Sequence, residues 1–567
     1  MYFTLEQRLK TALREHLRHA YTVDLADLVV ESPPRSELGE FALPVCFELA
    51  RQLRRPPRQI AQEIAQALAL PPGFERVEAA GGGYLNFYVQ RAAAWDAATA
   101  NRTELQPRFS QPAHPKVIVE HTNINPNKAA HIGHLRNAVL GDTWVRLLRH
   151  RGEAVEVQNL LDNTGVQVAD VVIAFLRDST PEAAQRAVAA ALSNPAQPFD
   201  SLCWDKYADI SQLPEVLAAQ RPETLRLIEA GANPVAELAE LIASNIVRAH
   251  LRTMERLHIR YDVLPRESEI LHLHFWDQAF ELLKAKQVAR LETTGANAGC
   301  WVMDWAPDDA SPAPTSEAQP EAAAVNDVKV LVRSTGTVTY VAKDIGYQMW
   351  KFGLLPLEFG YRRFHQYSDG HQIWTTALRP DPDAPAFGHG DWVFNVIDVR
   401  QSYLQDIVTF ALRVLGYQRQ AEHSVHFSYE MVALTPACAA ELGYATAGEK
   451  RVDVSGRKGT GVKADDLIDR MEANTRAEVE KRHPEMAAEE QHLAAHQIAV
   501  CALRYFLLKY TRTTLIAFDF KEALSFEGET GPYVQYAAVR AGTILRKAGL
   551  DADAAVAAAS AWAAAPH

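Results

Sequence analysis

Two histidines flank an Ile-Gly pair in the segment His131-Ile132-Gly133-His134, where residue types and spacing first suggest chemistry. Four β-prone residues, 117–120, come before a polar, Asn-rich loop, and a long helical pattern begins at the histidines. Unpaired amides at a helix N-terminus favour anions such as phosphate, and imidazoles there can donate further hydrogen bonds. Gly133 lacks a Cβ, so a flat base could lie against its backbone. The segment predicts a site that activates an acid with ATP.

A glycine-rich basic loop, 454–460, lies far downstream. By itself, such a loop is more simply interpreted as a solvated surface turn. Together with the histidine segment, it resembles the two ATP motifs of class I aminoacyl-tRNA synthetases. This resemblance implies Ser455, Arg457 and Lys458 as further ATP-binding residues beside His131, Gly133 and His134. The candidate catalytic residues, which would neutralise phosphate charge, are His131, His134, Lys128 and Lys458.

The elements that must position these residues follow from hydrophobic periodicity. Strand 117–120, helix 131–150 and strand 155–161 form a βαβ unit, and Gly152 follows the end of the helix. A mostly helical segment spans about 168–290, and the pattern from 471 onward is almost entirely helical. Further strands are expected at 328–332, 338–341 and 393–399, a disordered insert at 305–325, and a second loop insertion at 353–390.

Composition sets the broad class. The chain has 567 residues, of which 48% are apolar and 23% charged, with a formal net charge of −12, as in soluble globular proteins. Its five cysteines form no CxxC pair, so we expect no structural zinc or other protein-held metal, and a reducing compartment. We find neither an apolar signal core nor a run long enough to span a bilayer, and expect a cytoplasmic protein without a membrane partner.

Several separated motifs together resemble the arginyl-tRNA synthetases, a family of class I aminoacyl-tRNA synthetases. They occur in the family's order and cover the chain to about residue 549. The segments are 119–142 with the HxGH motif, 160–167 (LLDNTGVQ), 336–345 (GTVTYVAKDI), 455–459 (SGRKG), 502–505 (ALRY) and 533–540 (YVQYAAVR). The Asp162-Asn163-Thr164-Gly165 stretch lacks the tryptophan of the commonest form and is closer to an archaeal-type subgroup.

The resemblance implies a pocket for arginine. A guanidinium has donors in a planar fork that a carboxylate accepts in parallel, which an ammonium cannot match. Asp344 is the expected carboxylate, with Tyr340 one helical turn earlier, Glu120 at the strand end and His131 as helpers. Asn125 is expected to hold the α-amino or carboxylate group, and Gln401 is a further carry-over. A charge at a helix start is the alternative for Asp344.

The resemblance also implies the fold class and the division of the chain. We expect an α/β protein with a class I, Rossmann-like catalytic domain, an N-terminal α+β domain and an incomplete C-terminal all-α anticodon-binding bundle. The expected segments are a tRNA-contacting domain at 1–95, a linker at 96–115, the first Rossmann half at 116–175, a helical insertion at 176–325, the second half at 326–425, the mobile ATP loop at 426–470 and the partial bundle at 471–567.

The implied function is ATP-dependent attachment of L-arginine to tRNA(Arg) through an arginyl-adenylate. Magnesium would arrive with the ATP, the ester would form on the 2′ hydroxyl of the terminal adenosine, and bound tRNA would precede activation. A monomer is expected. Because the family's bundle continues beyond residue 549, a non-catalytic tRNA-binding paralogue is the alternative. A small nucleotidyltransferase is a second one, since such enzymes also use HxGH.

Contacts to tRNA are expected from the C-terminal helices and from the first domain. Tyr533 and Tyr536 could stack on unpaired anticodon bases or belong to the bundle core, and the sequence leaves both open. Basic residues accompany them. The C-terminal candidates are Arg504, Tyr533, Tyr536 and Arg540, and the N-terminal cluster, which could equally be a solvated helix face, is Arg51, Arg54, Arg55 and Arg58.

Overall fold

The computed structural model describes residues 2–25, 28–33, 36–90, 116–272, 275–305, 328–336, 338–444, 452, 461–551 and 554–555. The chain divides into two compact units, Met1–Gln106 with Val539–His567, and Pro107–Ala538. This division is coarser than the seven expected segments, whose boundaries stay predictions. The expected linker at 96–115, the insert at 305–325 except Trp305, and the basic loop 455–458 lie outside the described residues.

The N-terminal part is the expected α+β unit. Leucines spaced every four residues along α1, at 5, 9, 13 and 17, are buried and form one apolar helix face. They pack with Phe41, Leu85 and Phe87 of an antiparallel sheet with the order β1-β3-β2. The elements are α1 (Tyr2–Tyr21), η1 (Ser36–Leu38), β1 (Phe41–Leu43), α2 (Val45–Leu53), α3 (Pro57–Ala67), β2 (Phe74–Ala80) and β3 (Tyr84–Val89).

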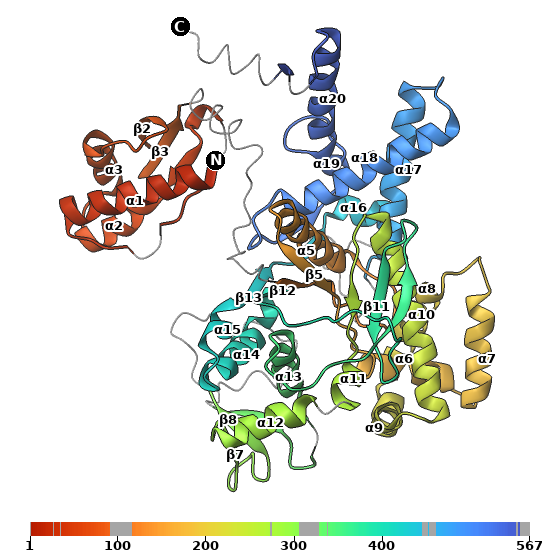
Figure 1. Cartoon of the computed structure of the whole chain (residues 1–567). Coiled ribbons are helices and arrows are strands. Elements are labelled where there is room, and N and C mark those ends of the chain that lie inside the picture. The colour runs from red at the N-terminus through yellow and green to blue at the C-terminus, as the bar shows by residue number, and fades with distance from the viewer. Residues whose placement is uncertain are drawn as a thin grey trace. The chain divides into compact units, whose positions relative to one another are not determined.

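A seven-stranded sheet with the order β10-β11-β6-β5-β4-β12-β13 forms the centre of the second unit (Figure 1). Its strands are parallel except β10, which pairs antiparallel with β11 at one edge. In register, Asn395, Glu120, Gln158 and Val263 lie side by side across four strands. The strands are β4 (Lys116–Glu120), β5 (Ala154–Gln158), β6 (Val263–Leu264), β10 (Tyr361–Gln366), β11 (Gln372–Thr376), β12 (Trp392–Asp398) and β13 (Ser424–Tyr429).

The predicted loop insertion at 353–390 is wrong, because this segment contains β10 and β11. Polar side chains such as Arg362, Arg363 and Gln372 interrupt the apolar alternation by which strands are recognised. The strands are nevertheless joined to the main sheet, since Trp374 and Thr375 pair with Val263 and Leu264. A predicted strand at 338–341 is also wrong: Val338 forms an isolated bridge to Val332, and a helix starts at Tyr340.

Helices cover both faces of the sheet, as in a doubly wound α/β fold. Val117 and Val119 of β4 point into a core shared with α5, α17 and α18, whereas Ile118 points into a core shared with α12, α13 and α14. The expected βαβ unit is therefore confirmed as β4-α5-β5. The covering helices are α5 (Ile132–His150), α12 (Phe275–Ala285), α13 (Tyr340–Lys351), α14 (Ser402–Val414), α15 (Gln418–His423), α17 (Ala464–Arg482) and α18 (Ala488–Leu508), and η3 (Val399–Gln401) precedes α14.

The mostly helical segment between β5 and β9 is confirmed. Its helices pack around a separate apolar core that contains Val172, Tyr207 and Leu238, and a small antiparallel sheet, β7-β8-β9, follows. The elements are α6 (Val166–Leu176), α7 (Pro181–Leu192), α8 (Phe199–Ser211), α9 (Pro214–Ala230), α10 (Pro234–Arg256), α11 (Glu267–His272), β7 (Ala289–Leu291), β8 (Trp301–Asp304) and β9 (Val328–Val332).

The C-terminal region is mainly helical and is tied to α5 by one buried side chain. The guanidinium of Arg136 is fully buried and donates hydrogen bonds to the carbonyl oxygens of Met431, Thr511, Arg512 and Thr514. This fixes the helix that follows the HxGH segment. The remaining elements are β14 (Val432–Leu434), α16 (Pro436–Glu441), β15 (Ile516–Phe518), α19 (Phe520–Ala523) and α20 (Gly531–Lys547). No helix within the described ranges is long and apolar enough to cross a bilayer.

Candidate active site

The two histidines meet at the N-terminus of α5. His131 has extended backbone angles and lies just before the first helical residue. Its backbone N–H donates to Nδ1 of His134 at 3.1 Å, and the two rings stack with centroids 3.6 Å apart. Since Nδ1 of His134 accepts this hydrogen bond, the proton of its neutral ring sits on Nε2. His134 is therefore arranged as a donor through Nε2.

Both imidazoles are neutral at physiological pH. Burial, followed by the nearby charge of Lys128, lowers the pKa of His131 to about 3. Burial also lowers the pKa of His134 well below its ordinary value, with His131 as the next cause. A phosphate bound here would meet hydrogen-bond donors from the histidines, and positive charge would have to come from lysine or arginine.

Gly133 leaves room for the ring of His131. A Cβ at position 133 would lie 3.0 Å from Cε1 and 3.1 Å from Nδ1 of His131, closer than side-chain carbons normally approach. The expected reason for this glycine, close approach of a flat base, is untested. The structure adds a second one, the orientation of the first histidine.

Lys128 precedes the histidines in a buried loop. Its ammonium lies 4.6 Å from the ring centroid of Tyr207 and 5.7 Å from that of Trp204, both on α8. Its carbonyl oxygen is 2.7 Å from Nε2 of His250 on α10. Burial lowers the pKa of His250 to about 4, so this imidazole is neutral and donates to the carbonyl. His250 was not predicted, because only the fold brings position 250 to position 128.

The basic loop is held at both ends, although Ser455, Arg457 and Lys458 lie outside the described residues. Val452, before the loop, exchanges backbone hydrogen bonds with Leu434 of β14 at 3.0 Å. After the loop, Lys463 forms a bridge with His131, and the N–H of Ala464 donates to the carbonyl of Ala130 at 2.8 Å. The chain thus returns from the loop directly to the histidine segment.

The residues expected to bind arginine come from elements near the carboxyl edge of the same sheet. Because Tyr340 opens α13, Tyr340 and Asp344 are one turn apart on one helix face. Glu120 ends β4, and Gln401 is exposed three residues after the end of β12, the strand beside β4. Asn125 is half-buried in the loop after β4. No direct contact from Asn125 or Gln401 to Asp344 is seen in the described part of the chain.

Two carboxylates near Asp344, those of Glu120 and Glu267, are neutralised by lysines. The ammonium of Lys351 lies 2.6 Å from Oε2 of Glu120, and that of Lys343 lies 2.7 Å from Oε1 of Glu267. Glu120 also accepts a hydrogen bond from Nδ2 of Asn123 at 2.7 Å. Glu120 is therefore already paired with Lys351, and its expected contact with arginine stays a prediction.

Asp344 differs from these carboxylates. It forms no hydrogen bond or ion pair with any described residue, and part of its side chain is still exposed to solvent. Burial, reinforced by Glu267 and Glu120, raises the pKa of its carboxyl to about 7. Lys351 and Lys343 act on this carboxylate only at longer range, so it lacks a direct ion-pair partner, and a cationic ligand would supply one.

A buried carboxyl pair beside the pocket was missed by sequence reasoning. Asp162 and Glu267 share a hydrogen bond, and burial and the neighbouring Glu267 raise the pKa of Asp162 well above its usual value. Hydrogen bonds from Asp162 and Lys343 outweigh burial and lower the pKa of Glu267. One proton is thus held between the two, with Glu267 as the anion. A Cβ on Gly165 would lie 2.2 Å from Oδ2 of Asp162, so this glycine protects the pair.

Models of two domain families match the chain. The arginyl tRNA synthetase N terminal domain matches residues 7–89, and the class I (R) tRNA synthetase catalytic domain matches residues 98–352. The arginine–tRNA ligase of Deinococcus radiodurans is 37% identical over 549 residues, which cover 96% of this chain and 81% of that protein. The chain belongs to the arginyl-tRNA synthetase family. A second relative, an arginine–tRNA ligase of Thermus thermophilus, is 36% identical, with 92% of this chain and 79% of that protein covered.

Solved structures of the family agree with this assignment. The arginyl-tRNA synthetase of Thermus thermophilus superimposes with a TM-score of 0.66 and 33% identity, covering 96% of this chain and 82% of that one. The Plasmodium falciparum enzyme, at 13% identity and a TM-score of 0.59, shares the fold. The expected fold class is confirmed, and these matches favour a synthetase over the two alternatives raised from the sequence.

One residue expected to contact tRNA has a different place in this synthetase. Arg504 donates to Oδ2 of Asp142 at 2.5 Å and to the carbonyl of Leu257 at 2.7 Å, and only 15% of its side chain is exposed. These contacts join α18 to α5 and to the end of α10. We therefore assign Arg504 a structural role in place of the expected tRNA contact.

The other candidates for tRNA contact stay predictions. Tyr533 and Tyr536 on α20 are 48% and 52% exposed, which favours an accessible surface over a bundle core within the described residues. Arg540 follows Tyr536 by one helical turn. In the predicted N-terminal cluster, Arg55 pairs with Glu63. The other three members of the cluster, Arg51, Arg54 and Arg58, are exposed.

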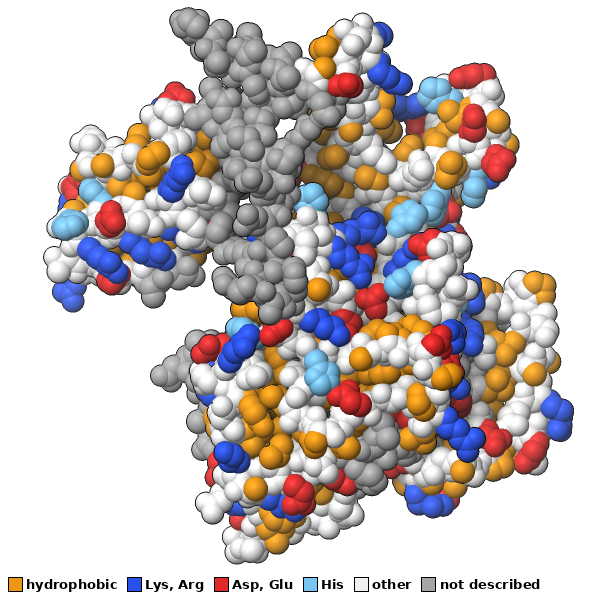
Figure 2. Space-filling model, in the orientation of Figure 1, with side chains coloured by type: hydrophobic (Ala, Val, Ile, Leu, Met, Phe, Trp, Pro, Cys, Tyr) orange, Lys and Arg blue, Asp and Glu red, His pale blue; other side chains and the backbone are white. Residues whose placement is uncertain are grey.

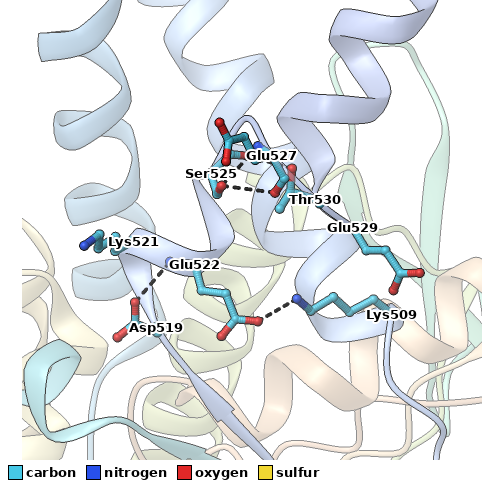
Figure 3. A pocket seen from close by; sticks show the side chains of 9 residues that line it. Lys509, Asp519, Lys521, Glu522, Ser525, Glu527, Glu529 and Thr530 are labelled. Carbon is cyan, nitrogen blue, oxygen red and sulfur yellow. Dashed lines mark hydrogen bonds and ion pairs between the residues drawn. The ribbon is translucent and has the colours of Figure 1, made fainter. Parts of the chain in front are cut away.

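A cavity of about 490 Å³ near α19 does not coincide with the histidine segment or the arginine pocket (Figure 3). Lys509 on its wall is neutralised by Glu522 at 2.6 Å. Three more carboxylates line it against one further lysine, so its charge is unsuited to phosphate. The lining residues are Lys509, Asp519, Lys521, Glu522, Ser525, Glu527, Gly528, Glu529 and Thr530.

Proposed function

We propose that this synthetase joins L-arginine to tRNA(Arg) in two steps. The arginine carboxylate attacks the α-phosphate of ATP, which forms arginyl-adenylate and releases pyrophosphate. A hydroxyl of the terminal tRNA adenosine, the 2′ hydroxyl by family resemblance, then attacks the acyl carbon and releases AMP. The observation that carries this proposal is Asp344, a carboxylate without a direct ion pair among the described residues, at the same sheet edge as the histidine segment.

Arginine selection would rest on Asp344. Its two oxygens can accept parallel hydrogen bonds from a guanidinium, and Tyr340 lies on the same helix face to cover the substrate. A lysine substrate would offer a point charge and leave one oxygen of Asp344 without a hydrogen bond. Because an unsatisfied acceptor in the site weakens binding, arginine would be preferred over lysine. Asn125, His131 and Gln401 would contact the α-amino and carboxylate groups.

ATP activation would use donors and cations in separate roles. His131 and His134 would donate neutral hydrogen bonds to the phosphates, while Lys128 and Lys458 would neutralise the charge that develops as pyrophosphate leaves. Ser455 and Arg457 would accompany Lys458. The protein thus acts by positioning both reactants, because the substrate carboxylate is itself the nucleophile.

Magnesium would accompany the nucleotide and offset phosphate charge. Among the described residues, no group of three or more His, Cys, Asp or Glu is arranged to hold a metal ion. We further propose that the protein acts as a cytoplasmic monomer and binds tRNA before it activates arginine.

The test is a charging assay with purified chain, ATP, magnesium and tRNA(Arg), supplied separately with arginine, cysteine and glutamate. Arginine alone should become esterified to tRNA, and pyrophosphate exchange should depend on added tRNA. A non-catalytic paralogue would charge none of the three amino acids. A nucleotidyltransferase would release pyrophosphate without consuming tRNA acceptor ends.

A further inference from the structure

One face of α10 carries side chains spaced four residues apart, at Glu240, Ser244, Arg248 and Arg252. This spacing places them in a row along the helix. The row faces the β10-β11 hairpin, since the guanidinium carbon of Arg248 lies 4.5 Å from the ring centroid of Phe364 (Figure 1). The segment predicted as a loop insertion therefore forms a β-hairpin that packs against α10.

Arginines gather where α10 meets the hairpin. Arg266 donates to both oxygens of Glu240, at 2.6 and 2.7 Å, and Arg362 lies 3.6 Å from the same carboxylate. Arg248 and Arg252 join them from the helix. We call the four residues, Arg248, Arg252, Arg266 and Arg362, the arginine cluster.

The arginine cluster has more positive charge than its neighbours balance. In the described part of the chain, Glu240 is the one carboxylate within ion-pair distance of any of the four, and it is already shared by two. Asp200 interacts with Arg252 at longer range. Figure 2 shows Lys and Arg side chains in several groups on the face that it presents.

Arg248 carries an unsatisfied hydrogen-bond donor in this cluster. Its Nη1 atom is buried and has no hydrogen-bond partner in the described part of the chain. Burial, then the charges of Arg362, Arg252 and Arg266, lowers its pKa, against a raising effect of Glu240 alone. An unsatisfied buried donor is costly, and a phosphate oxygen would satisfy it.

The cluster lies on the sheet edge that carries the active site. Arg266 follows β6 by two residues, and Arg362 lies opposite Thr375 near the end of β11. His250, which holds the carbonyl of Lys128, is two residues from Arg248 and so about 200° around the helix. A helix with its side chains is about 10–12 Å across. The arginine cluster is therefore about one helix width from the loop of the proposed catalytic lysine.

We propose that the arginine cluster binds phosphates in the single-stranded 3′ end of the tRNA while the terminal adenosine occupies the active site. This inference rests on the proposed function. A single strand carries one phosphate per nucleotide, and its flexible backbone can follow a strip of arginines over a short distance. ATP has its own donors on the other side of α10, so the cluster is left for the nucleotides that precede the terminal adenosine.

The first test is the variant Arg248→Gln/Arg252→Gln/Arg362→Gln, with Arg266 kept as the partner of Glu240. The matched control is Arg363→Gln, whose side chain alternates to the other face of β10 and is paired with Asp381 and Asp383. Charging is measured against tRNA concentration at several salt concentrations. We expect the KM for tRNA to rise about tenfold, with unchanged KM values for arginine and ATP.

Salt dependence supplies an independent readout. The slope of log kcat/KM for tRNA against log salt concentration should become shallower by about 0.7 for each phosphate that the variant no longer binds. An unchanged slope in the triple variant would overturn the proposal. Arg252→Gln alone, at an exposed position on α10, tests the same slope should the triple variant fold poorly.

The second test separates the 3′ end from the rest of the tRNA. Binding is measured with intact tRNA(Arg) and with tRNA trimmed back to its base-paired stem. The triple variant should lose affinity for intact tRNA and bind trimmed tRNA as the wild type does. Equal losses for both would move the arginines to the duplex and contradict the proposal. Failure of the wild-type protein to charge tRNA at all would instead refute the proposed function.

Discussion

The proposed nucleotide end and the proposed arginine end of the active site differ in how their charged groups are balanced. At the nucleotide end, burial keeps His131 and His134 neutral, and lysine supplies the positive charge. At the arginine end, lysines neutralise Glu120 and Glu267, whereas Asp344 is left without a partner among the described residues. The difference teaches that an unbalanced charge, rather than the number of charged residues, identifies the place of a charged substrate.

The largest expected effect is a loss of stability when the ion pair between Lys351 and Glu120 is broken. Lys351→Met would leave Glu120 buried and unpaired, and loss of one partner from a buried ion pair costs about 3–5 kcal/mol. We expect the free energy of unfolding in urea to fall by that amount. The double variant Lys351→Met/Glu120→Gln should recover much of the loss. Equal stability of the single variant and the wild type would show that Glu120 is already solvated.

A somewhat smaller effect is expected at the nucleotide end. His134→Ala removes a donor to phosphate, which typically costs about 2.7–4 kcal/mol of barrier, or about a hundred- to a thousand-fold in kcat. Arginine-dependent pyrophosphate exchange in the presence of tRNA measures it. His483→Ala, an exposed position after α17, serves as the control. Near wild-type exchange by His134→Ala would remove this histidine from the site.

Removal of the unbalanced charge should act on arginine alone. Asp344→Asn keeps the shape but loses charge-assisted hydrogen bonds worth about 1.5–3 kcal/mol. The KM for arginine should rise about ten- to a hundred-fold while the KM for ATP stays near the wild-type value. Asp178→Asn, at an exposed and distant position, is the matched control. A larger change in the KM for ATP would place the pocket elsewhere.

The raised pKa of Asp344 predicts how arginine binding depends on pH. Its carboxyl, with a pKa of about 7 in the free protein, is protonated below that pH and can no longer pair with guanidinium. The KM for arginine should therefore rise about tenfold for each pH unit below 7 and stay constant above it. Asp344→Asn should abolish this dependence, and a flat wild-type profile would contradict the assignment.

The same pKa makes a prediction about stability. A folded-state pKa above the ordinary value means that ionisation of Asp344 disfavours the native state, so its contribution to stability falls as pH rises from about 4 to 7. Asp344→Asn should thus melt at a higher temperature than the wild type at pH 8, and the difference should shrink toward pH 4. Calorimetry at several pH values measures it.

The smallest expected effect is an absence of change at the nucleotide end. Because the pKa of His131 is lowered to about 3 and that of His134 lies well below its usual value, neither ring titrates between pH 6 and 8. At saturating arginine, kcat for pyrophosphate exchange should stay flat through the ordinary histidine pKa. A step near pH 6.5 would mean that one imidazole acts as a cation.

The hydrophobic pattern of the sequence correctly predicted the elements that carry the histidine segment. The strand, loop and helix around His131 follow from period-2 and period-3.6 patterns, and the spacing of Tyr340 and Asp344 fits the helix found there. The strand predicted at 338–341 was wrong because β-branched residues favour strands, whereas Thr339 in fact immediately precedes a helix.

Long-range pairs could not be predicted from one sequence. His250 supports Lys128 from 122 positions away, and Lys351 neutralises Glu120 only because α13 covers the end of β4. Similarly, β10 and β11 are stable strands because they extend an existing sheet, although their own alternation is weak. Which distant residues come into contact depends on the order and direction of the strands and helices. The hydrophobic pattern of a single segment does not determine that arrangement.

Because Asp344 has no ion-pair partner among the described residues, bound arginine would stabilise the folded protein. A bound guanidinium would neutralise a charge that the folded chain leaves unbalanced, so arginine would act as a removable structural ion. A ligand at a hundred times its dissociation constant stabilises the native state by about 2.7 kcal/mol. In a cell short of arginine, this synthetase would therefore be both idle and easier to unfold, and its amount would follow the supply of its substrate.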